Sequence, residues 1–404
     1  MHLLFCHDKF YIRGNDGKVY SYGSFPYHLW ESRFLPHFES MTVVGIKKKR
    51  TAEETGVLEV SSGRNVEHIL LPNIHAPFKR LIQSQRIFRK IREQVVKADA
   101  VVVRGPVDFG IMAARAARSL GKPYAVEMTS CAYDSNYFNG SMLGKAYASL
   151  AYRMTREMVL HADAVMYATE HFLQSRYPTQ GISAFAPNVE IAAAPEFVLS
   201  QRLERLEENK DAPVTIGIIG NLMGGFRGLD VAFEALGIVK KMESIPEFKL
   251  RILGQGFAPQ WQETIRSYDL DGHIEFCGSM PRGQAVLEWL DGIDLYLQPS
   301  PHQGLPRPMI EAMSRGCAVL ASDAGGAPEL IDGHFVHPRG DAPALAAHIV
   351  EMLQNGHRAE QAKRNFKKAK TYSNEFLAPR RLQFWSDFSD LARERKNAGF
   401  KKKA

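Results

Sequence analysis

The sequence has 404 residues, of which 45% are hydrophobic and 24% are charged, so it is long enough for two globular domains and is neither fibrous nor disordered. No uninterrupted apolar run reaches the ~18 residues of a membrane-spanning helix, and the N-terminus lacks the basic start and apolar stretch of a signal peptide. The four cysteines lie far apart and form no Cys-x-x-Cys pair, so we expect reduced thiols and no cysteine zinc site.

The net charge of +7 is distributed unevenly along the chain. Residues 1–195 carry 24 Lys and Arg against 17 Asp and Glu, residues 196–374 carry 19 against 23, and residues 375–404 carry 8 against 4. The two basic segments could face an anionic surface, either a membrane or a nucleic acid, or could simply keep the protein soluble.

Apolar runs alternate with amphipathic segments in the first half of the chain. This alternation predicts a parallel sheet with helices on both faces, the architecture of an α/β fold. The predicted strands are 3–5, 41–46, 100–103, 123–126 and 164–168, and the predicted helices include 78–96 and 110–120.

A highly charged segment, residues 199–213, interrupts this pattern and ends in Pro213, so we place a domain boundary just before or within it. The alternation then restarts, which predicts a second doubly wound domain and a cleft where the carboxyl ends of the strands bind ligands. Its predicted strands are 214–219, 249–253, 274–276, 295–297 and 318–321, and its predicted helices are 229–241, 259–269, 283–290 and 309–315.

A glycine-rich turn, residues 220–228, follows the first of these strands and begins with Gly220 and Asn221. Such a turn exposes backbone N–H groups at the start of a helix, which suits a phosphate, and the Arg227 guanidinium would add two parallel donors. The turn matches neither the Gly-x-Gly-x-x-Gly fingerprint nor a Walker loop, so a simple chain reversal remains the alternative.

A more specific segment, residues 299–313, reads PSPHQGLPRPMIEAM. Pro308 suits the first turn of a helix, which would put Glu311 in that turn, where its carboxylate could accept two ribose hydroxyls. A glutamate near a helix N-terminus is also a good capping residue, so that alternative stays open. Downstream, residues 322–331 add a Gly-Gly pair at a strand end and a helix that we expect to open at Pro328.

In this order, residues 214–331 resemble the retaining, GT-B-fold glycosyltransferases of family 4, which use nucleotide-sugar donors. That family has two glutamates eight positions apart, and Gln303 and Glu311 stand at this spacing here, while residues 310–316 and 325–330 match closely. The resemblance implies a GT-B fold: two doubly wound Rossmann-like domains facing a central cleft. It implies an acceptor-side domain in 1–195, a nucleotide-sugar domain in 196–374 and a helix in 375–404 that crosses back to the first domain.

The resemblance also implies roles for individual residues of the second domain. Glu311 is expected to accept the ribose hydroxyls. The family's first glutamate is Gln303 here, which still hydrogen-bonds the donor sugar but brings no charge. Because Asn221 stands where the family has arginine, diphosphate charge would rest on Arg227 and on N–H groups such as that of Gly220. Further expected donor contacts are Gly304 and Leu305 at the sugar, Phe276 and Met280 at the nucleobase, and Arg307, whose alternative is a salt-bridged surface arginine.

The first domain offers fewer candidates. The loop around Gly17 could approach the diphosphate or be an ordinary turn. Glu127 ends a predicted strand that faces the cleft, and Asp134 follows closely, so Glu127 is the catalytic candidate of this domain, although both could be caps.

The resemblance implies a hexosyltransferase-type enzyme that moves a sugar from UDP or GDP to an acceptor hydroxyl, with retention, in bacterial surface polysaccharide or lipid-linked glycan assembly. No Asp-x-Asp pair stands where a catalytic metal would bind, so neither a metal nor another cofactor is expected. The alternatives are a GT-B-type sugar-nucleotide epimerase and a basic nucleic-acid-binding protein, although no nucleic-acid motif appears.

We further expect a cytoplasmic protein that binds the anionic inner face of the cytoplasmic membrane without spanning it. Lys79, Arg86, Lys90 and Lys97 share one face of the predicted helix 78–97, and residues 47–50 and 401–403 are further basic clusters. The helix that crosses back is expected to bring the two basic regions together.

Overall fold

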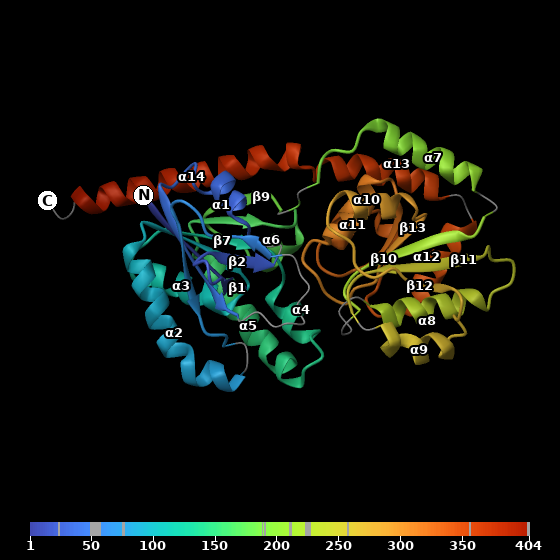
Figure 1. Cartoon of the computed structure of the whole chain (residues 1–404), viewed down its shortest axis with the longest axis horizontal. Helices are drawn as coiled ribbons and strands as arrows, with labels where there is room; N and C mark the ends of the chain where they lie inside the picture. The colour runs from blue at the N-terminus through green and yellow to red at the C-terminus, as the bar shows by residue number, and fades with distance from the viewer. Residues whose placement is uncertain are drawn as a thin grey trace.

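The computed structural model contains two sheets, one built from each half of the chain (Figure 1). The chain therefore has two α/β units, each with helices on both faces of its sheet, as the alternating pattern predicts. The residues described are 1–22, 25–48, 58–74, 77–187, 189, 191–209, 212–222, 228–256, 258–354 and 357–401.

The first sheet has a parallel core in the order β5-β3-β1-β6-β7-β8-β9. The second half of β1 continues beyond β6 and pairs with β2, and β2 pairs in turn with β4. Both pairings are antiparallel, and the sequence analysis predicted neither β2 nor β4. The strands are β1 (His2–Arg13), β2 (Val19–Tyr22), β3 (Ser40–Lys47), β4 (Leu58–Val60), β5 (Val66–Leu71), β6 (Ala100–Gly105), β7 (Tyr124–Met128), β8 (Ala164–Tyr167) and β9 (Ile182–Phe185).

Helices cover both faces of this sheet, because its central strands are buried on both sides and read as continuous Val, Ile and Leu runs. One face packs against α2 (Pro77–Lys97), α3 (Asp108–Ser119) and α5 (Met142–Leu160), and the other against α1 (Tyr27–Arg33) and α14 (Asn374–Lys401). Two short helices, α4 (Ala132–Tyr137) and α6 (Phe172–Arg176), follow β7 and β8 at the carboxyl edge.

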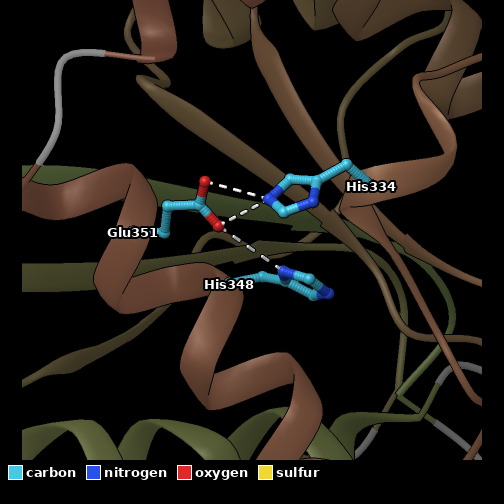
Figure 2. Close-up of side chains that lie close together, drawn as sticks. All are labelled: His334, His348 and Glu351. Atoms are coloured by element: carbon cyan, nitrogen blue, oxygen red, sulfur yellow. Dashed lines mark hydrogen bonds and ion pairs between the residues drawn. The ribbon is translucent and has the colours of Figure 1, made fainter.

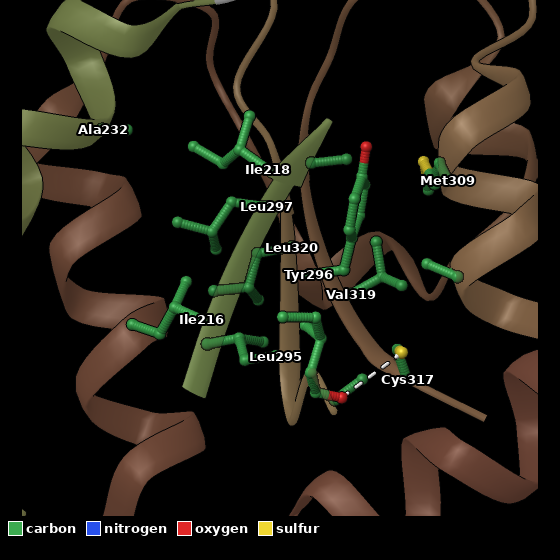
Figure 3. Close-up of a cluster of buried hydrophobic side chains, with 14 of the residues drawn as sticks. Ile216, Ile218, Ala232, Leu295, Tyr296, Leu297, Met309, Cys317, Val319 and Leu320 are labelled. Atoms are coloured by element: carbon green, nitrogen blue, oxygen red, sulfur yellow. Dashed lines mark hydrogen bonds between the residues drawn. The ribbon is translucent and has the colours of Figure 1, made fainter. Parts of the chain in front are cut away.

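The second sheet is parallel throughout, in the order β12-β11-β10-β13-β14-β15. Figure 3 shows how Ile216 and Ile218 of β10 pack with residues of β13 and β14 such as Leu297 and Leu320 in the core. The strands are β10 (Val214–Ile219), β11 (Phe248–Leu253), β12 (Ile274–Phe276), β13 (Leu295–Gln298), β14 (Ala318–Ser322) and β15 (Val336–His337).

Helices and short 3₁₀ turns connect the strands of the second sheet and continue beyond them. They are α7 (Glu196–Glu208), α8 (Leu229–Lys240), α9 (Gln262–Ser267), α10 (Gln284–Asp291), α11 (Arg307–Ser314), α12 (Ala342–Gln354), α13 (His357–Lys370) and the 3₁₀ turns η2 (Ala258–Trp261), η3 (Ala327–Glu329) and η4 (Gly333–Phe335). Two details differ from the prediction. The segment at Pro328 is only the 3₁₀ turn η3, and α11 begins at Arg307, so that Glu311 lies in its second turn and does not cap its first.

Helix α14 connects the two domains. Leu377, in its first turn, packs into the core of the second domain, whereas Phe384, Trp385 and Phe388 pack into the core of the first. The Phe34 and Trp385 rings lie 4.8 Å apart between centroids. Figure 1 shows this long red helix crossing to the first domain on the side opposite α2.

Several contacts join the carboxyl edges of the two sheets. The Glu329 carboxylate of the second domain accepts hydrogen bonds from the backbone N–H groups of Glu170, His171 and Phe172 at 2.6, 3.1 and 2.5 Å, at the start of α6. Arg339 donates to Asp323 and lies 3.7 Å from Asp134 Oδ2 across the boundary. These contacts fix one side of the cleft between the domains.

Candidate active site

A pocket of about 480 Å³ lies where the loops after β10, β11, β12 and β13 meet. In a doubly wound sheet of this order, the strand connections change direction between β10 and β13, and this crevice at the carboxyl ends is where ligands bind. The residues that line it are Ile219, Gly220, Asn221, Leu253, Gly254, Gln255, Ser279, Met280, Arg282, Val286, Arg307, Pro308 and Glu311.

Backbone groups form the floor of the pocket. The loop after β10 is held to the loop after β11, since the Leu222 N–H donates to the Gln255 carbonyl at 2.8 Å. A Cβ on Gly254 would lie 1.7 Å from the Gly220 carbonyl oxygen, so only glycine permits this approach. The two loops therefore bring main-chain polar groups, including those of Gly220 and Asn221, close to any ligand in the pocket.

Glu311 lies on the pocket wall and forms an ion pair with Arg307. Arg307 Nε donates to Glu311 Oε1 at 3.0 Å, one helical turn away, and the Glu311 side chain is 13% exposed. The guanidinium thus fixes one carboxylate oxygen. Both residues line the same pocket, so the ion pair belongs to the site and is not a remote surface contact.

Arg282 is a pocket residue that the sequence analysis did not single out. It lies between β12 and α10 in the segment Met280-Pro281-Arg282-Gly283, a proline and glycine turn before a helix. That turn was the available signal, but it says nothing about where the guanidinium points. Arg282 adds an exposed cation at the mouth of a pocket that already offers Arg307.

The loop of Gln303 and Gly304 lies at the boundary between the domains. A Cβ on Gly304 would lie 1.9 Å from the Thr129 carbonyl oxygen, which follows β7 in the first domain. Gln303 Nε2 is buried and has no hydrogen-bond partner among the described residues. A buried donor without a partner costs free energy, so a ligand that accepts a hydrogen bond there would recover it. Leu305 packs against the core of the second domain.

Glu127 is buried on β7 and forms an ion pair with Arg104 of β6, whose Nη1 lies 2.8 Å from Glu127 Oε2. Burial, with Arg104 and Arg282 nearby, lowers the pKa of the Lys9 ammonium. Glu127 therefore orients Arg104. Of the two side chains, Arg104 is the one that solvent reaches. Asp134 pairs with Arg176 and does not line the pocket.

Three other predicted contacts lie in different surroundings. Gly17 is in the turn of the β1–β2 hairpin with φ +77°, which fits the ordinary turn that we kept as its alternative. Met280 lines the pocket, whereas Phe276 packs against the core of the second domain and is not a lining residue. Arg227, the predicted phosphate ligand, lies outside the described residues.

Comparison with known proteins agrees with this geometry. Residues 213–355 match the family model described as "Glycosyl transferases group 1". The chain is 26% identical over 379 residues to Protein CapJ of Staphylococcus aureus, covering 93% of this chain and 92% of CapJ. It is 33% identical over 138 residues to the amylovoran biosynthesis glycosyltransferase AmsK of Erwinia amylovora, covering 32% of this chain and 33% of AmsK.

Among solved structures, HepE of Anabaena in complex with UDP-glucose superposes with a TM-score of 0.61 at 14% identity, covering 98% of this chain and 100% of HepE. The two sheets and their cleft define the GT-B fold. Together with the match of residues 213–355, this identifies a glycosyltransferase that carries a group 1 domain. That class replaces the epimerase and the nucleic-acid-binding protein considered as alternatives.

Proposed function

We propose that this glycosyltransferase takes a hexose from a UDP- or GDP-sugar and transfers it to an acceptor hydroxyl. The observation that carries the proposal is the pocket at the carboxyl ends of β10–β13, where the Glu311 carboxylate, the Gly220 backbone and the guanidinium of Arg282 meet. A carboxylate suits ribose hydroxyls, and cations with N–H groups suit a diphosphate. The structural neighbour HepE holds UDP-glucose, which supports a nucleotide-sugar donor.

We propose that transfer retains the anomeric configuration, as the resemblance to family 4 implies. Negative charge develops on the diphosphate as the anomeric bond stretches, and Arg282, with the predicted Arg227, would stabilise it. In front-face attack the departing phosphate takes the acceptor proton, so no carboxylate nucleophile is needed. Gln303, with its buried unpaired amide nitrogen, would donate to a hydroxyl of the donor sugar.

We propose a surface polysaccharide or a lipid-linked glycan as the product. The name of AmsK refers to the biosynthesis of such a polysaccharide, and CapJ is similar over nearly the whole chain. The carboxyl edge of the first sheet, with the Lys9 ammonium and the partly exposed Arg104, would face the acceptor. These cations favour an acceptor that carries phosphate or carboxylate groups.

We also propose that the enzyme works on the inner face of the cytoplasmic membrane, through helix α2. Arg86, Lys90 and Lys97 are exposed on this helix, whereas only the backbone of Lys79 is described. Helix α14 crosses to the first domain as expected, but it packs on the face of the first sheet opposite α2, so the two helices do not form one continuous basic surface. No helix in the described part of the chain is both long and apolar enough to span a bilayer.

A panel of UDP- and GDP-sugars scored by thermal shift tests the donor proposal. One nucleotide-sugar should raise the melting temperature of the wild type, and Arg282→Gln should reduce that shift strongly. The matched control is Arg266→Gln, an exposed arginine on α9 of the same domain, which should leave the shift unchanged. With the donor that binds, nucleoside diphosphate release should match glycoside formation, and NMR of the product should give the configuration of the donor.

Two results would contradict these proposals. A shift that survives in Arg282→Gln and falls in Arg266→Gln would move the donor site away from this pocket. Inversion at the anomeric carbon would overturn retention and leave the donor assignment intact.

A further inference from the structure

Three histidines surround one glutamate on the second domain, outside the residues that line the donor pocket. His334 Nε2 lies 3.0 and 2.9 Å from the two Glu351 carboxylate oxygens. His348 Nδ1 lies 3.8 Å from Oε2 of this carboxylate, and His357 Nε2 lies 3.5 Å from Oε1. Figure 2 shows the His334 and His348 rings directing these nitrogens toward Glu351.

The fold brings these four residues together from three elements. His348 and Glu351 are three residues apart on α12 and so share one face of the helix. His334 lies in the 3₁₀ turn η4 that precedes β15, and His357 begins α13. The buried Phe335 ring lies 4.8, 6.3 and 6.0 Å from the rings of His334, His348 and His357, so it forms an apolar base that positions all three.

The spacing is that of a ligand set. A tetrahedral ion bound at ~2.1 Å to nitrogen and oxygen ligands holds those atoms about 3.4 Å apart, and the distances to the Glu351 oxygens, 2.9–3.8 Å, bracket that value. Three imidazoles are more than one carboxylate needs as ion-pair partners. In the described part of the chain, His334, His348 and Glu351 form the one group of three or more His, Cys, Asp or Glu whose ligand atoms all lie within 4.8 Å of one another. His357 contacts Glu351 from outside this group.

We propose that His334, His348 and Glu351 bind one divalent transition-metal ion, with Zn²⁺ the best fit. Two imidazole nitrogens with one carboxylate oxygen suit Zn²⁺, whereas Mg²⁺ and Ca²⁺ prefer oxygen ligands. Three protein ligands leave the fourth tetrahedral position to a water molecule. Because these residues do not line the donor pocket, the ion joins α12 to the η4 turn and takes no part in sugar transfer.

Zinc titration of the untagged full-length protein, freed of metal with EDTA and dialysed, tests the proposal. Calorimetry should show one equivalent of Zn²⁺ bound, no comparable heat with Mg²⁺, and a higher melting temperature with Zn²⁺. His334→Ala and the milder His348→Asn should each weaken Zn²⁺ binding more than about tenfold. Binding of Co²⁺ should give the visible absorption of a tetrahedral site in the wild type only.

The matched control is His161→Ala, because His161 also pairs with a surface glutamate, Glu157, at 3.3 Å, but lies in the first domain and outside the proposed ligand group. This variant should bind Zn²⁺ as the wild type does. The proposal is overturned if the wild type binds no more Zn²⁺ than His334→Ala, or if His161→Ala loses as much affinity. Glycosyl transfer should proceed equally with and without Zn²⁺, and a strict Zn²⁺ requirement would refute the structural role.

Discussion

Glu311 has two oxygens in different situations, since only Oε1 receives the hydrogen bond from Arg307. The arginine holds the carboxylate in place and reduces the cost of keeping it charged in a half-buried position. A carboxylate held in this way needs no rearrangement when a ribose binds. This makes Glu311 the residue with the strongest claim to a contact that matters in the transition state.

Replacing Glu311 by alanine should therefore lower kcat/KM, and the decrease should correspond to a loss of about 2–4 kcal/mol of transition-state stabilisation. Glu311→Gln should lose less, because an amide oxygen still accepts a hydrogen bond. Steady-state kinetics with saturating acceptor would measure both. Glu288→Ala, an exposed residue of α10, serves as the control, and turnover of Glu311→Ala within threefold of wild type would remove the ribose assignment.

A second residue-scale prediction concerns Gln303, whose Nε2 is a buried donor without a partner in the described residues. Gln303→Glu should reduce activity with the native donor, because it replaces a donor by a buried negative charge. Gln303→Met keeps the length without charge and should also be impaired, but less. Equal or higher activity of Gln303→Glu with the same donor would mean that the position tolerates either group.

At the residue scale, the structure places in one pocket several residues that the sequence motifs singled out, because a motif fixes position along one loop. These residues are Gly220, Asn221, Met280, Arg307 and Glu311, and their roles stay predictions. The sequence analysis missed Arg282 and Arg104. Their positions near the site depend on which strands are neighbours in each sheet, and the order of the strands cannot be read from a local motif. Glu127 was recognised as a residue at a strand end, but its partner lies on the neighbouring strand, and pairing between strands is not written in either segment.

At the scale of elements, the start of α6 depends on the other domain. Its first N–H groups have no intrahelical partners, and Glu329 accepts from three of them across the boundary. Helix α6 has five residues and so contributes little stability of its own. The relative placement of the two domains and the order of α6 are thus linked through one carboxylate.

Glu329→Gln should lower the free energy of unfolding by about 1–3 kcal/mol, because charge-assisted hydrogen bonds from three N–H groups become weaker ones. Urea unfolding would measure the loss. Increased protease cleavage near residue 170 would locate it. The control, Glu360→Gln, changes an exposed glutamate of α13 and should have no effect. Equal stability of Glu329→Gln and wild type would contradict the role of this contact.

Strand β5 carries a second element-scale prediction. Burial, with Arg13 nearby, lowers the pKa of His68 from 6.5 to about 4, and burial also lowers the pKa of His7 well below its usual value. Between pH 6.5 and 4 the unfolded chain binds a proton at His68 that the folded chain refuses, so stability falls as the pH falls through this window.

From pH 7 to pH 5 the His68 contribution to this loss should be roughly 2 kcal/mol. His68→Gln keeps a polar side chain opposite Ser61 and removes the titration, so its unfolding free energy should fall less over the same range. Urea unfolding at the two pH values would measure the difference. A parallel decline of both proteins would show that His68 does not carry the acid sensitivity.

Element prediction from periodicity was reliable for long helices and for buried parallel strands such as β3 and β10. It failed for β2 and β4, which are short and form an antiparallel extension at the end of β1, where alternation is too brief to read. Strand β9 was missed because Ile182–Phe185 is half exposed and has no continuous apolar run.

On the scale of the whole molecule, the basic residues fall on different surfaces. The exposed face of α2 carries Arg86, Lys90 and Lys97, with Ile82 and Val96 exposed beside them. On α14, Lys396 forms an ion pair with Asp99 at 3.0 Å and Arg395 with Asp163. Helix α2 therefore combines unburied cations with exposed apolar side chains, which is a combination that binds an anionic bilayer.

Co-sedimentation with anionic vesicles should detect this binding at low salt, and added NaCl should reduce it. Changing Arg86, Lys90 and Lys97 together to Gln should remove about 3 kcal/mol of attraction. The control changes Lys363, Lys367 and Arg380 to Gln, which alters the net charge equally on α13 and α14. If the wild type stays in the supernatant at low salt, or if both triple variants bind alike, α2 is not a membrane-binding surface.

The crossing of α14 has a consequence for how the protein is made. Trp30, Phe34 and Phe38 emerge early from a ribosome, but the residues that cover them, Trp385 and Phe388, are synthesised only after the entire second domain. The aromatic surface of the first domain therefore stays exposed to water until the second domain and α14 have been synthesised. During translation this surface is where chaperones would bind the nascent chain, and α14 would displace them as the last step of folding.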